Sequence, residues 1–171
     1  MHPSLLSDTF AIATPTERSI EIRREFAAPR GLVWDAWTRP ELLRRWYGGP
    51  SGWRLDECEI DLRVGGAWRY LIRHETGPTM ALSGVYRVVE PGHLLVSSET
   101  NDDCDARAGG PEAVTSTELD DLADGRCLLV STVLLATTEL RDAMLASGME
   151  RGLVASYDRL DQLLGELGPV R

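Results

Sequence analysis

Apolar residues near the end of the chain recur with the period of one helical face. Between Gly148 and Leu167 they lie three or four positions apart: Met149, Leu153, Tyr157, Leu160, Leu164 and Leu167. A helix with such a stripe is stable in a globular protein when other elements cover the stripe. The pattern therefore predicts a long helix that lies against the rest of the fold.

Shorter segments in which apolar and polar residues alternate precede this helix. Alternation with a period of two indicates half-buried β-strands. The expected strands cover residues 19–26, 53–62, 67–75, 81–90, 93–100, 114–122 and 126–136. Turn residues bound each segment, and Asp124-Gly125 predicts a hairpin between the last two strands.

Two short helices are expected between the first and second strands. Pro29 suits the first turn of a helix that continues to Trp37, and Pro40 opens a second helix that ends near Trp46. Residues 1–17 contain Ser, Thr and Pro without an apolar period. We therefore expect a disordered N-terminal tail, followed by one domain over residues 18–171.

This order of elements predicts an α+β fold. Strands that follow one another in sequence usually pair, so the strands should form an antiparallel sheet that wraps around the closing helix. A curved sheet and a helix can enclose a cavity, and most small-molecule sites are cavities.

The composition narrows the range of partners. With 18 Lys and Arg against 27 Asp and Glu, the net charge of -9 repels a phosphate backbone on average, so nucleic acid is not an expected partner. No apolar run approaches the ~20 residues that cross a bilayer, so membrane insertion is not expected. The length of 171 residues suits a single domain with a sizeable core.

The cysteines and the first residues indicate a cytoplasmic protein. Cys58, Cys104 and Cys127 are odd in number, far apart and without the paired spacing of a zinc site. We therefore expect reduced thiols, no metal and no cofactor. The first residues also lack the basic segment and apolar core of a secretion signal.

Several motifs resemble, in the same order, those of the bacterial relatives of the activator of the heat-shock protein 90 ATPase. They are residues 28–42 (APRGLVWDAWTRPEL), 45–48 (RWYG), 58–68 (CEIDLRVGGAW), 84–86 (GVY), 90–91 (EP), 147–149 (SGM) and 157–160 (YDRL). The resemblance extends over nearly all of the chain between Ile20 and Leu164.

This resemblance implies the helix-grip fold of the superfamily that includes the birch-pollen allergen, the START lipid-transfer domains and the polyketide cyclases. In that fold a strongly bent antiparallel sheet grips the C-terminal helix, and a hydrophobic tunnel lies between them. The resemblance does not imply one activity, because the same fold serves carriers, cyclases, dehydratases and cochaperone modules.

Aromatic and polar residues on the inferred concave face are the candidates for ligand contact. Apolar walls with a few polar groups are typical of small-molecule sites, although the same residues could simply fill the core. The complete set of ligand-binding candidates is Arg24, Trp46, Trp68, Tyr70, Ile72, His74, Tyr86, Met149, Leu153 and Tyr157.

Arg24 is the most unusual member of this set, because it lies on an apolar strand face. A buried guanidinium needs a partner. That partner is either an acid on a neighbouring strand (Glu59, Glu99 or Glu118) or a carboxylate or phenolate of a ligand. His74 ends a strand and is expected near the cavity mouth, but no catalytic set emerges from the histidines and acids.

The leading hypothesis is that the protein binds a small, largely hydrophobic or aromatic molecule in the tunnel between sheet and helix. One alternative is a cyclase, dehydratase or hydrolase that acts on an aromatic or polyketide-like substrate in the same tunnel. Another is a stress-response or chaperone-interacting module. A homodimer through an exposed strand or through residues 46–53 is compatible with the sequence.

Overall fold

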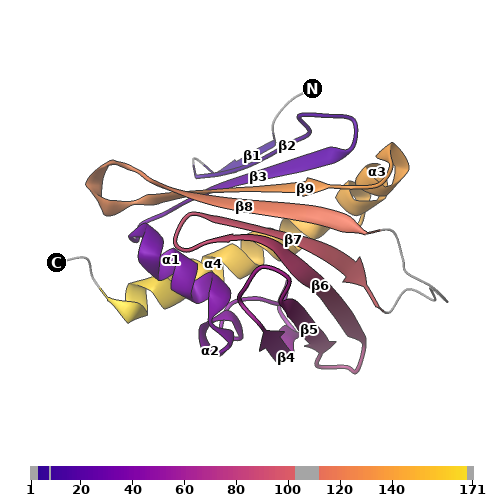
Figure 1. The fold of residues 1–171 in the computed structure, drawn as a ribbon, viewed down its shortest axis with the longest axis horizontal. Coiled ribbons are helices and arrows are strands. Elements are labelled where there is room, and N and C mark those ends of the chain that lie inside the picture. Colours follow the sequence, from indigo (N-terminus) through magenta and orange to yellow (C-terminus); the bar gives the residue numbers. More distant parts are fainter. Residues whose placement is uncertain (1–3, 8, 103–111, 169–171) are drawn as a thin grey trace.

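The computed structural model describes residues 4–7, 9–102 and 112–168. In this part of the chain the elements are β1 (Ser4–Ser7), β2 (Phe10–Ala13), β3 (Ser19–Phe26), α1 (Arg30–Thr38), α2 (Pro40–Leu43), β4 (Trp53–Ile60), β5 (Ala67–His74), β6 (Thr79–Glu90), β7 (Leu94–Asn101), β8 (Ala113–Asp121), a 3-10 turn η1 (Ala123–Gly125), β9 (Cys127–Leu134), α3 (Thr138–Ala146) and α4 (Met149–Leu167) (Figure 1).

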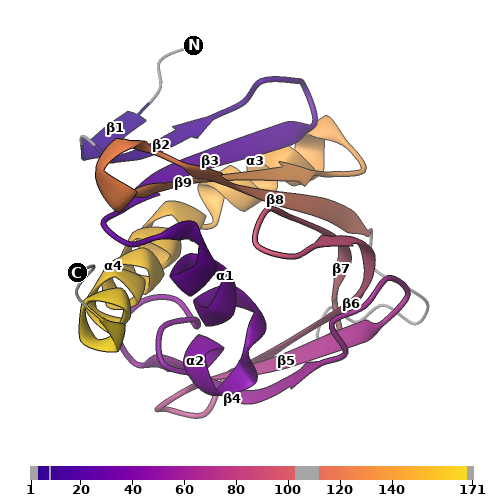
Figure 2. The ribbon, with the colours of Figure 1, turned by 60° about the vertical axis from the view of Figure 1, so that its left-hand side comes forward.

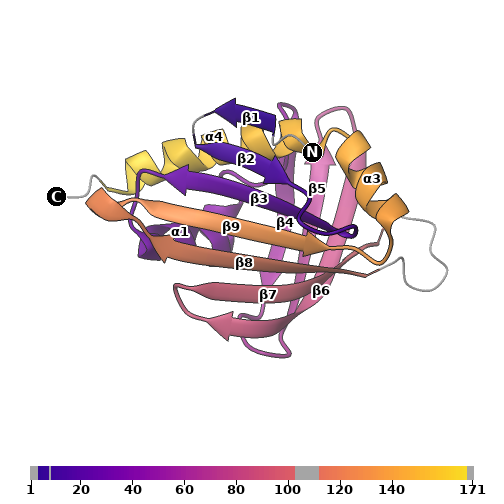
Figure 3. The ribbon, with the colours of Figure 1, turned by 90° about the horizontal axis from the view of Figure 1, so that it is seen from above.

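The strands form one antiparallel sheet in the order β1-β2-β3-β9-β8-β7-β6-β5-β4. Figure 3 shows β3, β9, β8 and β7 side by side, and Figure 2 shows the sheet bending through β7 toward β5 and β4. Helices α1, α2 and α4 lie on its concave side (Figure 2). The sheet is open, with β1 and β4 at its edges. The predicted α+β helix-grip fold is confirmed.

The beginning of the chain differs from the predicted tail. Strand β2 pairs with β3, with Phe10 opposite Arg24 and Ile12 opposite Ile22, and β1 pairs with β2. Phe10 is 2% exposed. The expectation of disorder is wrong for these strands, because Phe10 and Ile12 alternate as in a strand that buries one face. A four-residue alternation is too short to stand out among Ser, Thr and Pro.

The hairpin between β8 and β9 is confirmed and has a physical cause. Asp124 and Gly125 have φ values of 64° and 71°. Two consecutive positive φ angles match the right-handed twist of the flanking strands, and Asp-Gly adopts them at little cost.

Helix α4 buries its apolar stripe unevenly. Tyr157, Leu160 and Leu164 are at most 3% exposed, whereas Met149 and Leu153 are only half-buried. Leu167 was expected in the stripe but is 38% exposed, and it is the last residue of α4. The predicted long helix is confirmed, and its two halves have different surroundings.

The described cysteines and helices agree with two further expectations. Cys58 and Cys127 are free and buried, and burial raises the pKa of each thiol to about 11. Cys104 lies outside the described residues. Within those residues, no helix is both long enough and apolar enough to cross a membrane.

Candidate functional site

Arg24 fixes the C-terminal half of α4 to the sheet. Its guanidinium donates to Asp158 Oδ1 at 3.2 Å and to the Asp161 carboxylate, and it lies 5.7 Å from the centroid of the Phe26 ring. The Arg24 side chain is 8% exposed. These contacts give Arg24 a structural ion pair between β3 and α4, which weakens the case for a ligand anchor.

The partners of Arg24 differ from the acids expected from sequence. Those were residues on other strands: Glu59, Glu99 and Glu118. That prediction is wrong, because β3 packs directly under α4. Asp158 and Asp161 lie three residues apart on α4, so both carboxylates reach the same guanidinium.

The loop between α2 and β4 is fastened to α4 by hydrogen bonds. The Arg159 guanidinium donates to the carbonyl oxygens of Trp46 at 3.0 Å and Gly49 at 2.5 Å. The Gly49 N–H donates to Ser156 Oγ at 3.0 Å. This clamp holds Tyr47, between the two accepting residues, against the sheet, where its ring centroid lies 5.4 Å from that of Tyr70.

Aromatic rings fill the interior under the C-terminal half of α4. The Tyr157 ring centroid lies 5.8 Å from Phe26, 6.2 Å from Phe10, 6.0 Å from Trp37 and 6.3 Å from Trp46. The Trp46 indole N–H donates to a backbone carbonyl of α1 at 2.9 Å. Two of the predicted ligand contacts, Trp46 and Tyr157, therefore belong to a filled core.

The interior is covered less completely toward the N-terminal half of α4. Apolar residues there are only half-buried, although they pack against the core: Tyr47, Trp53, Tyr70, Met80, Met144, Leu145, Met149, Leu153 and Val154. We call this group the open half of the interior. Grouped apolar side chains that keep solvent contact are a feature of binding sites.

Two tyrosine hydroxyl groups meet on the β5–β6 part of the concave face. Tyr70 and Tyr86 share a side-chain hydrogen bond, and burial raises the pKa of both phenols. The Trp68 and Tyr70 rings lie 4.7 Å apart between centroids. Ile72, on the same face of β5, is 2% exposed. The alternation of β5 thus brings the predicted residues together as expected.

Glu99 adds a carboxyl group to the open half. Ser97 of β7 pairs with Tyr86 of β6. Glu99 lies two residues further along β7 and therefore projects from the same face of the sheet. Glu99 is half-buried, and its side chain has no ion pair or hydrogen bond among the described residues. Burial raises the pKa of its carboxyl, because the ionised form loses hydration. Burial raises the pKa of the Tyr47 phenol, and the charge of Glu99 raises it further.

The Trp68 indole nitrogen is buried without a partner. Trp68 is 4% exposed, and its Nε1 has no hydrogen-bond acceptor within the part of the chain that the structure describes. Trp68 pairs with Gly84 on β6, and a Cβ added to Gly84 would lie 2.7 Å from that nitrogen. The same Cβ would lie 1.8 Å from the Ser98 carbonyl oxygen, so glycine at this position makes room for that carbonyl and the indole edge together. Such orphaned N–H groups are rare in native proteins.

His74 lies at the rim and not among these groups. Its ring centroid is 4.9 Å from that of Trp53, and its Nδ1 is 2.8 Å from Thr76 Oγ1 in the following turn. These contacts keep the imidazole at the end of β5, so a role at the cavity mouth stays a prediction.

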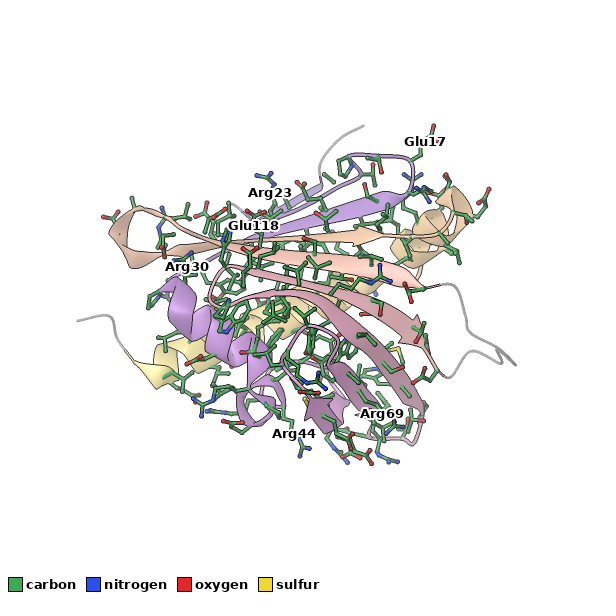
Figure 4. All side chains as sticks on the ribbon, viewed as in Figure 1. Glu17, Arg23, Arg30, Arg44, Arg69 and Glu118 are labelled. Carbon is green, nitrogen blue, oxygen red and sulfur yellow. The ribbon has the colours of Figure 1, made fainter. Side chains whose placement is uncertain are left out.

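Two surface hollows are outlined by the described residues, and both are open to solvent. One of about 460 Å³ lies on the outer face of the sheet beside Arg69, Val85 and Glu112. Figure 4 shows Arg69 at the periphery of the molecule, on β5. The other, of about 350 Å³, lies beside Arg126 and Asp161. Neither lies under the N-terminal half of α4, so the tunnel implied by the resemblance stays a prediction.

One cluster among the described residues has the atoms of a metal site. His93, Glu118 and Asp120 offer ligand atoms within 4.8 Å of one another. The two carboxylate side chains are 49% and 51% exposed, and His93 Nδ1 lies 3.1 Å from the Leu119 carbonyl oxygen. Exposed groups of this kind commonly form weak ion pairs in water, and we assign no metal to them.

Sequence reasoning missed Tyr47 and Glu99 as members of the candidate site. Tyr47 was considered only as part of the motif at residues 45–48, and Glu99 only as a partner for Arg24. The spacing of Leu95, Ser97 and Glu99 does carry a signal, since alternate strand residues share a face. The structure therefore adds two polar groups to the predicted Trp68, Tyr70 and Tyr86.

The fold recurs in solved structures of bacterial proteins. A protein from Rhodobacter sphaeroides is 32% identical, with 93% of this chain and 99% of that chain covered and a TM-score of 0.84. A Nitrosomonas europaea protein is 24% identical, with coverage of 90% and 97% and a TM-score of 0.77. The AHSA1 protein from Silicibacter pomeroyi is 21% identical, with coverage of 88% and 99% and a TM-score of 0.70.

Comparison with curated protein sequences finds no match. A family model described as "Activator of Hsp90 ATPase homolog 1-like protein" matches residues 27–165. That match includes α1, α2, β4–β9, α3 and most of α4, and thus all of the interior residues above except those on β2 and β3. The chain therefore belongs to the family of Activator of Hsp90 ATPase homolog 1-like proteins.

Proposed function

We propose that the protein binds a small, largely apolar molecule in the open half, between the N-terminal half of α4 and the β4–β7 part of the sheet. The observation that carries this proposal is the contrast along α4. Tyr157 and Leu160 are 2% and 0% exposed, and four aromatic rings surround Tyr157, whereas Met149 and Leu153 on the same stripe keep solvent contact. The family's fold generally binds ligands, which agrees with this use of the interior.

Covering this surface provides the free energy for binding. Removing apolar surface from water is worth roughly 25 cal/mol per Å², and the open half presents several partly exposed apolar side chains. A ligand that covers these side chains removes their apolar surface from water, as the aromatic rings do under the C-terminal half of α4.

The residues around the open half can rearrange to admit a ligand. Met80 lies on β6, Met144 on α3 and Met149 at the start of α4, and all three are half-buried. Methionine side chains are flexible and adapt to different shapes. Entry therefore needs side-chain movement and leaves the sheet register unchanged.

A tryptophan placed on either side of the sheet locates the site. Leu153→Trp fills part of the open half, while Val85→Trp, at a position 42% exposed, occupies the outer hollow. Thermal unfolding is followed with a panel of fatty acids, flavonoids and aromatic polyketides. A ligand at 100 times its Kd stabilises the folded state by about 2.7 kcal/mol, and so raises the Tm of the wild type.

The two variants give opposite results if the proposal is correct. We expect Leu153→Trp to abolish the ligand-dependent rise in Tm and Val85→Trp to retain it. Loss of the rise in Val85→Trp alone would move the site to the outer face and contradict the proposal. The unliganded Tm of each variant controls for damage to the fold.

The enzyme alternative has one observation in its favour, which is Glu99. A half-buried carboxyl whose pKa is raised by burial is a general-acid candidate. A cyclase or dehydratase acting in the open half would therefore use this carboxyl. Turnover of an aromatic or polyketide-like substrate that persists unchanged in Glu99→Gln would remove Glu99 as its acid. A chaperone-interacting role stays a prediction from the family resemblance.

A further inference from the structure

Among the described residues the Trp68 indole N–H has no hydrogen-bond acceptor, although it is buried. A buried donor without a partner costs about 1 to 3 kcal/mol. The indole ring packs against Tyr70, 4.7 Å between centroids, and its Nε1 lies over Gly84. An oxygen atom of a bound molecule would supply the missing acceptor.

Glu99 lies close to this N–H in the sheet, and we call the surroundings of the two polar groups the niche. The register that pairs Ser83 with Thr100 and Tyr86 with Ser97 sets Gly84 opposite Glu99 on one side. On the other side Glu99 pairs with Ala113 of β8. Glu99 is thus flanked by the two smallest residue types, so no side chain at position 84 separates its carboxyl from the indole edge, and the Ser98 carbonyl oxygen lies where a Gly84 Cβ would be.

The two polar groups in this niche need opposite hydrogen-bond partners. Trp68 can only donate a hydrogen bond, whereas the Glu99 carboxylate accepts one. A hydroxyl group satisfies both, because its oxygen accepts from the indole and its hydrogen is donated to the carboxylate. A ligand carboxylate would bring a second negative charge next to Glu99, which has no cation paired with it among the described residues.

We propose that Trp68 and Glu99 form a two-point hydrogen-bonding site that selects an uncharged aromatic molecule with a hydroxyl group over the corresponding carboxylate. This inference rests on the proposed function, since it names the ligand class for the same interior site. The aromatic preference follows from the walls, where Tyr47, Tyr70 and Trp68 form a run of rings. Glu99 and Trp68 thereby become the residues that determine specificity.

Three probes with the same ring system test this selection by isothermal titration calorimetry near pH 7.5. They are 2-naphthol, 2-methylnaphthalene and 2-naphthoate, which differ only in the group at one position. For the wild type we expect 2-naphthol to bind about 2- to 10-fold more tightly than 2-methylnaphthalene, as one or two net hydrogen bonds provide. We expect 2-naphthoate to bind most weakly of the three.

Two conservative variants separate the roles of the two residues. Glu99→Gln removes the charge but keeps the shape, so 2-naphthoate should gain about 10-fold or more while 2-naphthol changes by less than about 3-fold. Trp68→Phe keeps a ring but removes the N–H, so 2-naphthol should lose about 5-fold and 2-methylnaphthalene should change little. Circular dichroism and the Tm of each variant confirm that it is folded.

The outcomes distinguish this inference from the proposed function. Equal binding of 2-naphthol and 2-methylnaphthalene, with no selective effect of Glu99→Gln, overturns the two-point site and leaves apolar binding intact. Wild-type binding of 2-naphthoate as tight as that of 2-naphthol also overturns it. If none of the probes binds the wild type, the inference falls, and the proposed function falls with it only if the fatty acids, flavonoids and aromatic polyketides also fail to raise the Tm.

Discussion

At the residue scale, Glu99 is in an environment that disfavours its ionised form. The carboxyl is half-buried, has neither a cation nor a hydrogen-bond donor among the described residues, and has Gly84 and Ala113 on the neighbouring strands. The fold therefore carries an energetic cost at this position whenever the carboxyl is charged. Costs of this kind are common at functional sites, where a bound molecule can offset them.

Glu99→Gln should stabilise the unliganded protein at neutral pH and have little effect in acid. The folded pKa is raised above its ordinary value of 4.5, so the wild type is fully stable below that value and loses stability as the pH rises through the folded pKa. The glutamine variant does not undergo this loss. Tyr47, whose phenol is coupled to Glu99, stays neutral because burial raises its pKa above 10.

Urea unfolding of both proteins from about pH 4 to about pH 8 measures this difference. The free energy of unfolding of the variant should exceed that of the wild type increasingly as the pH rises. A difference that is constant over this range, or one that grows toward acid, would show that the carboxyl is not destabilised by burial.

The sequence revealed one polar group of the niche and not the other. Trp68 could be assigned to the concave face, because alternation within β5 places it with Tyr70 and Ile72. Glu99 could not be set beside Trp68, since their distance depends on the register across β6 and β7, which shifts between Tyr86 and Val88. A single residue of slip would have placed Glu99 on the outer face.

At the element scale, α4 is held by polar contacts in one half and left partly exposed in the other. Arg24 and Arg159 bind its C-terminal half to β3 and to the loop before β4. The N-terminal half begins after Gly148, whose φ of 83° separates α4 from α3. The open half can therefore adjust while the rest of the helix keeps its place.

Removing the acids on α4 should destabilise the protein more than removing Arg24. In the double variant Asp158→Asn, Asp161→Asn the buried guanidinium keeps its charge without an anion, for which we expect a loss of about 3 kcal/mol. Arg24→Met leaves carboxylates that are 59% and 39% exposed, so its loss should stay below about 1 kcal/mol. Urea unfolding at neutral pH gives both values, and the reverse order would mean that Arg24 is not structurally paired.

The elements of the fold were predictable where their patterns were long. The stripe of α4 extends over five turns, and the strands from β3 to β9 alternate over eight or more residues, so local sequence determines them. Strand β2 has only four residues, and its burial depends on pairing with β3. Leu167 fits the helical period, yet it is exposed at the last position of α4.

At the scale of the whole molecule, the order of elements led to the correct architecture because each strand from β4 to β9 pairs with its neighbour in sequence. Strand β3, which precedes α1, pairs with β9, the last strand of the chain, and the two lie together under α4. What sequence could not supply is the distribution of space inside this sheet. This distribution depends on how side chains from elements far apart in sequence pack together. Tyr157 and Trp37 fill the interior under the C-terminal half of α4, while the N-terminal half stays partly exposed.

A crystal structure of the protein with bound 2-naphthol tests the central claim most directly. The account predicts the naphthalene ring between Leu153 and Tyr70 in the open half, with its hydroxyl oxygen within hydrogen-bond distance of Trp68 Nε1 and of the Glu99 carboxylate. A ring in the outer hollow beside Val85, with the interior unchanged, would contradict it.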